Sequence, residues 1–374
     1  MKKVIYWAPI ISNIATKKAV INSAFALTNF SKNYQVTLLN VCGEFSDLKD
    51  SNKNINIYNL NQKIIEMKLN GEGYFKTRYY FILVFIKSFF PLVKFIKKEA
   101  PDFIIIHMLT SLPLIIFFIF NLKTKCILRI SGLPRLNFFR YFLWKICSKK
   151  VYKVTCPTEL TRKKIENSNL FNSSQLITLY DPIFTNKDLI KRRNKTDFKE
   201  KFLLSAGRLT RQKNFPLLIN AFDQFKLPDT KLYIAGEGEE KNKLLELIKK
   251  KNLSDKIKLI GYREDLIELM SNCECFILTS KWEDPGFVLI EAIISRANII
   301  SSDCENGPRE LINHEKNGFL FKNGSLKDLI ATFNRFKLTP QKSLYHRKVN
   351  GLKNAKNFSI VNHYKKLNTI LKSN

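Results

Sequence analysis

The sequence predicts an α/β protein with two doubly wound, Rossmann-like domains that face one another across a cleft. Its 374 residues suffice for two domains with separate cores, and 45% of them are hydrophobic. Short apolar runs typical of strands alternate with amphipathic helical stretches, and no Asn-Gly pair joins the first strand-like runs. This alternation is typical of parallel sheets covered by helices on both faces. The pattern starts twice, at residue 1 and again near residue 201.

The first domain is expected over residues 1–184. Lys17–Phe30 has the apolar spacing of a helix between the first two strands. The predicted strands are Lys3–Pro9, Tyr34–Val41, Ile55–Leu60, Pro101–His107, Lys125–Ile130, Val151–Cys156 and Leu176–Tyr180. The polar stretch after Asp181–Pro182 predicts a linker at residues 185–200.

The second domain, expected over residues 201–355, repeats this order. Its predicted strands are Phe202–Ala206, Lys231–Ala235, Lys256–Ile260, Cys275–Thr279 and Asn298–Ser302. Its predicted helices include Phe215–Phe225 and Glu239–Lys250. Because parallel strands end at a common edge, ligand-binding residues are expected in the loops that follow these strands.

Cysteine usage and the start of the chain indicate a cytoplasmic location. The seven cysteines are odd in number and include no C-x-x-C pair, which is typical of thiols in a reducing compartment. The start, MKKVIYWAPII, is basic and then apolar, but Pro9 and the missing small-residue cleavage site disfavour a signal peptide. We therefore interpret it as the first strand.

The net charge of +31 is unevenly distributed along the chain. Residues 1–180 hold 27 basic and 9 acidic residues, residues 201–330 hold 20 and 19, and residues 331–374 hold 10 and none. A nucleic-acid-binding protein is one function that the total charge suggests, and it predicts basic residues around the ligand cleft. The nearly neutral segment 201–330, which carries the candidate site, disfavours that function.

Ser280–Asp303, SKWEDPGFVLIEAIISRANIISSD, carries the first part of the candidate site. It reads as a loop, a helix over Phe287–Ser295 and a buried strand. A helix that begins at Pro285–Gly286 presents backbone N–H groups and a positive dipole end, which suit a phosphate. Glu291 lies in a strongly apolar helix, so its carboxylate indicates a function rather than a solvated surface position.

The segment GRLTRQKN supplies the second part. Arg208 and Lys213 follow the strand Phe202–Ala206 and Gly207, at the edge where open α/β sheets bind ligands. Two fixed cations there suit a diphosphate, with surface charges as the alternative. No Asp-x-Asp pair and no G-x(4)-G-K-[ST] loop occur, so we expect no metal–nucleotide site and no cofactor.

The stretch EDPGFVLIE has two glutamates with seven residues between them and resembles the signature of the retaining nucleotide-sugar glycosyltransferases of group 1, also called family 4, which have the GT-B fold. GRLTRQKN and NGPRELI resemble further segments of that family, and the strong likeness covers residues 202–322. The resemblance implies transfer of a sugar from a nucleoside diphosphate sugar to an acceptor with retention of configuration. It also implies an acceptor-binding first domain, a donor-binding second domain, and a final helix at residues 356–374 that crosses back to the first domain. A sugar-nucleotide epimerase of the same architecture is the alternative.

The resemblance also assigns roles to single residues. It implies that Arg208 and Lys213 contact the diphosphate, that Glu283 holds donor-sugar hydroxyls and that Glu291 binds the ribose. His107 matches a histidine near the donor sugar in some relatives, with a core histidine as the alternative. The expected catalytic residues are Glu283, Arg208, Lys213 and His107, and the expected donor-binding residues are Gly207, Arg263, Gly286, Phe287, Val288 and Glu291.

Two features of the first domain depart from the family. The segment PIISNIATKK lacks the paired glycines that relatives often place near donor and acceptor, and Ser131-Gly132 stands where many relatives have His-Gly. These departures concern the acceptor side of the expected site.

Two stretches of the first domain predict a membrane-facing surface. In Tyr79–Lys98, the residues Lys87, Pro91, Lys94 and Lys98 fall on one stripe of a helix, and the interior lysines and proline disfavour a spanning segment. Arg135–Lys153 interleaves aromatic and basic residues, as bilayer interfaces favour. Core helices with solvated lysines are the alternative. We predict a peripheral protein on the inner face of the cytoplasmic membrane, bound to anionic lipids, with a lipid-linked or cell-envelope glycan as acceptor and no nucleic acid partner.

Overall fold

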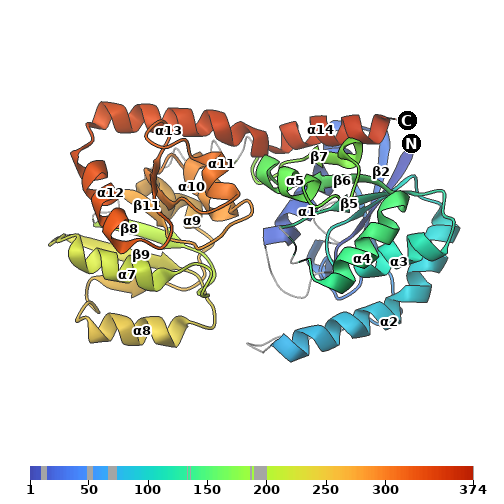
Figure 1. The fold of residues 1–374 in the computed structure, drawn as a ribbon, viewed down its shortest axis with the longest axis horizontal. Helices are drawn as coiled ribbons and strands as arrows, with labels where there is room; N and C mark the ends of the chain where they lie inside the picture. The colour runs from blue at the N-terminus through green and yellow to red at the C-terminus, as the bar shows by residue number, and fades with distance from the viewer. Residues whose placement is uncertain are drawn as a thin grey trace. The chain divides into compact units, whose positions relative to one another are not determined.

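The computed structural model describes residues 1–9, 15–48, 54–65, 74–132, 134, 136–185, 188 and 200–373. The chain divides into two compact units (Figure 1). Unit 1 comprises Met1–Ile183 and Ile360–Asn374, and unit 2 comprises Phe184–Ser359. Each unit contains one parallel sheet flanked by helices, so the predicted class of two doubly wound α/β units is confirmed. Most of the predicted linker at 185–200, and residues 10–14 of the first strand–helix loop, lie outside the described residues.

Unit 1 is built on a seven-stranded sheet with the order β3-β2-β1-β4-β5-β6-β7. Its strands pair in parallel throughout. They are β1 (Lys2–Trp7), β2 (Tyr34–Asn40), β3 (Ile55–Asn59), β4 (Phe103–Ile106), β5 (Lys125–Arg129), β6 (Val151–Cys156) and β7 (Leu176–Thr178). Each coincides with a predicted strand to within a few residues, because short apolar runs between polar turns are a strong strand signal.

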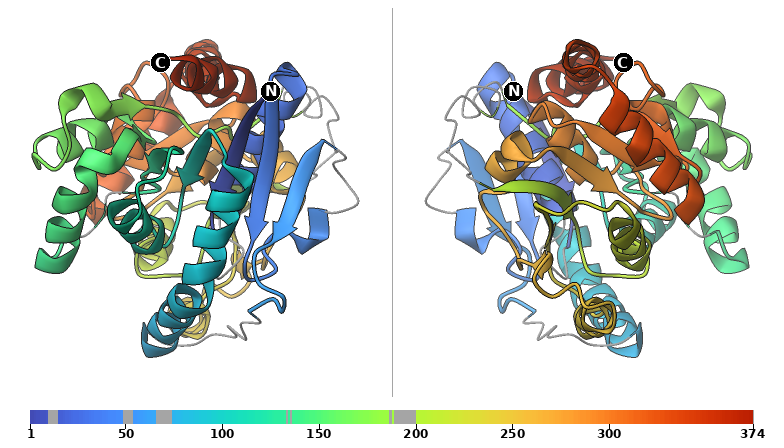
Figure 2. Two further views of the ribbon diagram at one scale, coloured as in Figure 1. Left: turned by 90° about the vertical axis from the view of Figure 1, so that its right-hand side faces the viewer. Right: turned by 90° about the vertical axis from the view of Figure 1, so that its left-hand side faces the viewer.

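The sheet of unit 1 is buried on both faces, as β1 illustrates. Ile5 and Trp7 belong to the core cluster on one face, and Val4 and Tyr6 belong to the cluster on the other. The first cluster includes residues of α2 (Tyr74–Glu99), α3 (Ser111–Ile119), α4 (Phe138–Cys147) and α5 (Glu159–Glu166). The second includes residues of α1 (Ala15–Phe30) and α14 (Ile360–Lys372). Helices α2, α3 and α4 lie side by side (Figures 1 and 2).

The final helix α14 packs against α1 within unit 1. Its His363 is buried, and its ring nitrogens bond Ser23 Oγ at 2.8 Å and the Tyr180 carbonyl oxygen at 2.7 Å. These two bonds attach the end of the chain to the first helix and to the segment that leaves the sheet.

Unit 2 is built on a six-stranded sheet with the order β10-β9-β8-β11-β12-β13. All of its strand pairs are parallel. The strands are β8 (Lys201–Ala206), β9 (Thr230–Ala235), β10 (Ile257–Leu259), β11 (Cys275–Leu278), β12 (Ile299–Ser302) and β13 (Phe319–Phe321). The last of these was not predicted, since three residues carry too little periodicity.

Helices flank this sheet as well. They are α7 (Phe215–Gln224), α8 (Lys241–Lys250), α9 (Leu266–Asn272), α10 (Phe287–Ile294), α11 (Gly307–Leu311), α12 (Leu326–Leu338) and α13 (Gln341–Ala355). Residues of α7, α8 and α12 share one core cluster with β-strand residues such as Leu203 and Ile277. Helix α10 contacts α9 and α13.

None of the seven cysteines forms a disulfide, and six of them are buried. Within the described chain, one helical segment, Arg78–Glu99 of α2, is long and apolar enough to cross a membrane, which is weak evidence for a span because the core helix of a globular protein meets the same criteria. Val84, Leu92 and Ile96 are part of the core, so this helix serves at least in part as a core helix of unit 1.

Candidate active site

The candidate site lies where the strand order of unit 2 reverses. From β8 the sheet continues to β9 and β10 on one side and to β11, β12 and β13 on the other. Open α/β sheets bind ligands outside the carboxyl ends of the strands at such a reversal. The loops that follow β8 and β11, together with α10, carry all the predicted site residues except Arg263 and His107.

Lys213 and Glu283 form a buried ion pair at this edge. Lys213 Nζ donates to Glu283 Oε1 at 2.5 Å, and their side chains are only 11% and 6% exposed. Ser280 Oγ donates to the same carboxylate oxygen at 2.6 Å. Burying two charges costs free energy that a structural role alone repays poorly, so such a pair indicates a function for both groups. The ammonium of Lys213 has three N–H donors, and its bond to Glu283 uses one.

Hydrogen bonds join the loops that bear these two residues. Lys281 N donates to Gln212 O at 2.8 Å, and Gln212 Nε2 donates to Trp282 O at 2.8 Å. Thr279 Oγ1 donates to Lys213 O at 2.9 Å. The position of Lys213 relative to Glu283 is therefore fixed by the backbone as well as by the ion pair.

Two glycines allow the neighbouring loops to pack at backbone distance. A Cβ atom on Gly236, whose φ is +134°, would lie 2.0 Å from the carbonyl oxygen of Gly207. A Cβ on Gly307 would lie 1.6 Å from the carbonyl oxygen of Pro285. Any side chain at either position would push apart loops that border the site.

Helix α10 presents its amino terminus at the same edge. Its N-cap Gly286 has a φ of +86°, and the first N–H bonded within the helix region is that of Leu289, which donates to Gly286 O at 3.0 Å. The N–H groups of Phe287 and Val288 precede it, as expected for the start of a helix. Phe287, Val288 and Glu291 are the half-buried residues of α10, and the other five are buried. The three predicted donor-binding residues of this helix thus share the face that is not in the core.

Sequence reasoning assigned no role to three polar residues of this edge, namely Ser280, Thr210 and Asn306. Thr210 Oγ1 and Asn306 Oδ1 are buried and have no hydrogen-bond partner among the described residues. Asn306 forms a β-bridge with Glu283. Buried polar atoms usually have a hydrogen-bond partner, so these two atoms are available to a polar ligand or to water. No sequence signal distinguishes Thr210; for Asn306 the only signal is the Asn-Gly turn.

Arg208 is exposed, whereas Arg263 is engaged by a neighbour. Arg263 lies in the loop after β10 and donates to both carboxylate oxygens of Asp265, at 2.8 and 2.5 Å. This bidentate pair raises the pKa of Arg263 and lowers that of Asp265. The pair uses Nε and Nη2 of Arg263, and a role of Arg263 at the donor stays a prediction.

His107 belongs to unit 1, where it follows β4. It is 7% exposed and stacks on Tyr6 with a ring-centroid distance of 5.9 Å. Burial, together with the nearby charge of Arg129, lowers its pKa well below the usual value, so the imidazole is neutral. It also lines a cavity in unit 1. Its role at the donor sugar stays a prediction.

In the part of the chain that the structure describes, no three His, Cys, Asp or Glu side chains gather as a metal ion would require. Independence from metals and cofactors stays a prediction.

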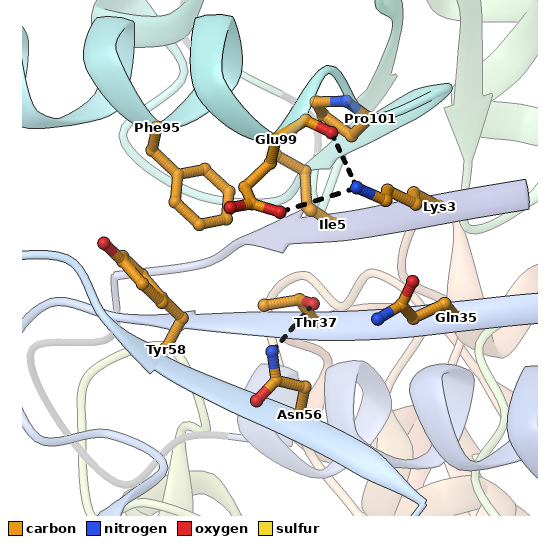
Figure 3. Close-up of a pocket in the computed structure, with 9 residues that line it drawn as sticks. All are labelled: Lys3, Ile5, Gln35, Thr37, Asn56, Tyr58, Phe95, Glu99 and Pro101. Atoms are coloured by element: carbon orange, nitrogen blue, oxygen red, sulfur yellow. Dashed lines mark hydrogen bonds and ion pairs between the residues drawn. The ribbon is translucent and has the colours of Figure 1, made fainter.

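A small polar cavity of about 100 Å³ lies elsewhere in unit 1, between strands β1 to β3 and the end of α2 (Figure 3). There Lys3 Nζ donates to Glu99 O at 3.0 Å. Its size suits little more than a few water molecules.

The fold agrees with solved structures over the whole chain. Anabaena HepE, crystallised in complex with UDP and glucose, superimposes with a TM-score of 0.75 at 18% identity, covering 100% of both chains. The chain thus has the GT-B fold of two Rossmann-like units.

Sequence comparison finds similar glycosyltransferases. Residues 186–352 match the glycosyl transferases group 1. An uncharacterized glycosyltransferase of Methanocaldococcus jannaschii is 32% identical over 256 residues, 62% of this chain and 63% of that one. The N-acetylgalactosamine-N,N'-diacetylbacillosaminyl-diphospho-undecaprenol 4-alpha-N-acetylgalactosaminyltransferase of Campylobacter jejuni is 41% identical over 122 residues, 33% of each chain. Residues 186–352 are therefore similar to the group 1 glycosyl transferases. The match spans less than two thirds of these two relatives.

Proposed function

We propose that this protein is a retaining glycosyltransferase that moves a sugar from a nucleoside diphosphate sugar to a lipid-linked or cell-envelope glycan. The observation that carries the proposal is the buried Lys213–Glu283 pair at the strand reversal of unit 2, beside the start of α10. The similarity of residues 186–352 to the group 1 glycosyl transferases supports it, as do the relative that acts on a diphospho-undecaprenol glycan and the neighbour crystallised with UDP and glucose.

The mechanism follows from the charge that develops when the donor breaks. Cleavage of the bond between the anomeric carbon and the phosphate oxygen leaves its electron pair, and thus negative charge, on the diphosphate. That charge is stabilised by the cationic side chains of Arg208 and Lys213. The backbone N–H groups of Phe287 and Val288 stabilise it through the helix dipole. Glu283 orients sugar hydroxyls, and Glu291 binds the ribose.

Retention requires the acceptor to attack from the face that the diphosphate leaves. A bond forms between the acceptor oxygen and the anomeric carbon, and the acceptor proton passes to the departing phosphate oxygen. The unpaired Thr210 Oγ1 and Asn306 Oδ1 supply further polar contacts for the donor.

A panel of nucleoside diphosphate sugars tests the proposal. Thermal shift should identify a stabilising donor, and product analysis with undecaprenyl-diphosphate-linked glycans should detect transfer with the anomeric configuration preserved. Conversion of the donor sugar without any acceptor would instead indicate the epimerase. No stabilisation by any nucleotide would refute the proposed donor site.

Exposed aromatic and basic side chains of unit 1 support association with an anionic membrane. The exposed apolar residues are Tyr79, Ile82, Ile86 and Phe90 of α2, Phe118 and Ile119 of α3, and Phe138, Phe139, Tyr141 and Phe142 of α4. Those of α2 recur at i, i+3, i+7 and i+11 and form one stripe. The exposed cations of α4 and the turn after it are Arg140, Lys145, Lys149 and Lys150. Rings and cations on one surface suit a bilayer interface. Arg135, also predicted for this surface, lies outside the described residues.

Liposome flotation tests this association. Each basic residue near an anionic surface contributes about 1 kcal/mol, so changing Arg140, Lys145, Lys149 and Lys150 to Glu should abolish flotation with anionic vesicles. The matched control changes Lys249, Lys250, Lys327 and Lys337 of unit 2, which are also exposed, to Glu. Equal recovery with neutral and anionic vesicles, or no recovery with either, would refute peripheral binding and favour a soluble acceptor.

A further inference from the structure

A cavity of about 660 Å³ opens at the carboxyl edge of the sheet in unit 1. Its walls come from the ends of β1, β4 and β5, the loops that follow β4 and β5, and helices α2 and α4. The volume lies within the roughly 300–1,000 Å³ of small-molecule sites. All its lining residues belong to unit 1, so the cavity is complete within that unit.

Many of the side chains that line the cavity are apolar. Phe81, Ile82 and Phe85 of α2 line it, together with Leu112 of α3, Trp144 of α4 and Trp7 of β1. A wall with so few donors and acceptors suits a hydrocarbon chain and leaves the hydroxyls of a sugar without partners. The wall contains one buried polar donor, Trp144 Nε1, that has no hydrogen-bond partner among the described residues.

The lining also contains two arginines with different surroundings. Arg129 is 2% exposed, and its charge is balanced by Asp181, whose Oδ1 accepts from Nη2 at 2.5 Å. Arg140 lies in the first turn of α4 and is exposed. His107, which also lines the cavity, is neutral because of burial. Among the described lining residues, Arg140 is therefore the solvent-accessible cation.

The cavity is continuous with the apolar surface of α2. Ile82 lines the cavity and is also 60% exposed in the stripe of Tyr79, Ile82, Ile86 and Phe90. An apolar chain can therefore pass from that stripe into the cavity along a surface that remains hydrophobic.

We propose that this cavity binds the apolar chain of a phosphate-bearing lipid next to its head group, with the phosphate at Arg140. The chain lies along the α2 wall and extends past Ile82 onto the exposed stripe. This inference rests on the proposed function and deepens it, because it specifies the acceptor as a glycan carried on a lipid phosphate whose tail is held by unit 1. The exposed cation and the apolar wall complement the two parts of such a molecule.

Tryptophan fluorescence measures the binding directly, since Trp7 and Trp144 line the cavity and Trp282 is the third tryptophan of the chain. The full chain with Trp282→Phe is titrated with farnesyl diphosphate, lysophosphatidate, farnesol and inorganic diphosphate, each below its micelle concentration. We expect saturable changes with the two amphiphiles and at least tenfold weaker binding of farnesol and diphosphate. Preference for farnesyl diphosphate assigns an isoprenoid lipid, and preference for lysophosphatidate assigns an acyl lipid; both support the site.

Matched variants separate the cavity from the surface around it. Ile82→Ser should weaken farnesyl diphosphate binding at least threefold, since each buried methylene contributes about fourfold in affinity. Ile86→Ser, one turn further along the same exposed stripe and outside the cavity, should weaken it less than Ile82→Ser, because only the part of the chain beyond the cavity reaches Ile86. Arg140→Gln should weaken the binding of farnesyl diphosphate and leave the binding of farnesol unchanged. Lys149→Gln should change the binding of neither ligand. Ser131→Trp, at an exposed lining position, should block the cavity.

Failure of this inference is distinguishable from failure of the proposed function. If neither amphiphile binds, or if Ile82→Ser and Ile86→Ser have equal effects, the cavity proposal is overturned, even where a nucleotide sugar still stabilises the chain. Unchanged binding to a folded Ser131→Trp chain, with folding checked by circular dichroism, also overturns it. If the amphiphiles bind the cavity and no nucleotide binds, the lipid site stands and the glycosyltransferase proposal fails.

Discussion

Replacing Glu283 by Gln should make the nucleoside diphosphate bind more tightly while sugar transfer is lost. The substitution removes one negative charge but keeps the side-chain shape, so the contacts with Lys213 and Ser280 can persist. In the wild-type protein, Glu283 offsets the charge of Lys213 and lies close to the proposed diphosphate. The free nucleoside diphosphate has no sugar, so it does not use the hydroxyl contacts proposed for Glu283.

The size of the effect follows from distances. Glu283 Oε1 lies 2.5 Å from Lys213 Nζ, and a phosphate oxygen bonded to that ammonium would lie about 2.8 Å beyond it. The two negative oxygens are then at most about 5.3 Å apart, and their repulsion is about 1–3 kcal/mol for an effective dielectric constant between 80 and 20. We expect at least a fivefold gain in affinity for the nucleoside diphosphate.

Calorimetry with the nucleoside diphosphate, and separately with the nucleotide sugar, measures both parts of the prediction. The sugar-bearing ligand should gain less, or lose affinity, because its hydroxyls lose a carboxylate acceptor. Asp223→Asn is the control. Asp223 lies on α7, away from the strand reversal, and its Oδ2 is 2.9 Å from Lys251 Nζ, so the substitution removes a paired carboxylate of unit 2 outside the site. If Glu283→Gln weakens nucleoside diphosphate binding as Lys213→Ala does, the pair serves to position a loop and the diphosphate lies elsewhere.

Three further predictions concern other residues. Arg208→Ala and Lys213→Ala together should lower the affinity for the nucleoside diphosphate by more than about 2 kcal/mol, since each charge-assisted hydrogen bond contributes roughly 1.5–3 kcal/mol; unchanged calorimetric affinity would place the diphosphate elsewhere. Glu291→Ala should abolish donor binding in a chain whose circular dichroism is unchanged, because Glu291 is half-buried on the open face of α10; normal turnover by this variant would contradict its assignment. Burial raises the pKa of Glu44 from 4.5 to about 7, so its contribution to stability is fully present below pH 4.5 and is lost as the pH rises through 7. Glu44→Gln, which cannot ionise, should therefore equal wild type near pH 4 and exceed it by on the order of 2 kcal/mol above pH 7; hydrogen exchange in β2 that shows a pH-independent difference would argue against this.

Much of the architecture could be predicted from the sequence. The apolar runs at Tyr34–Val41 and Cys275–Thr279 coincide with β2 and β11 to within one residue, because a strand buried on both faces requires a continuous apolar run. The loop at Gly286 and the helix at Phe287 could also be predicted, because a proline and a glycine before an apolar, helically spaced run indicate the start of α10.

What the sequence could not determine depends on contacts between distant residues. Lys213 and Glu283 were predicted for separate parts of the donor, and only the adjacency of β8 and β11 brings these residues, 70 positions apart, to 2.5 Å. The unpaired polar atoms of Thr210 and Asn306 likewise depend on how loops pack. Periodicity shows that one face of α2 is apolar. Only the packing of that helix decides that Val84 is buried, that Ile86 is exposed and that Ile82 borders a cavity, because burial depends on which elements lie beside a face.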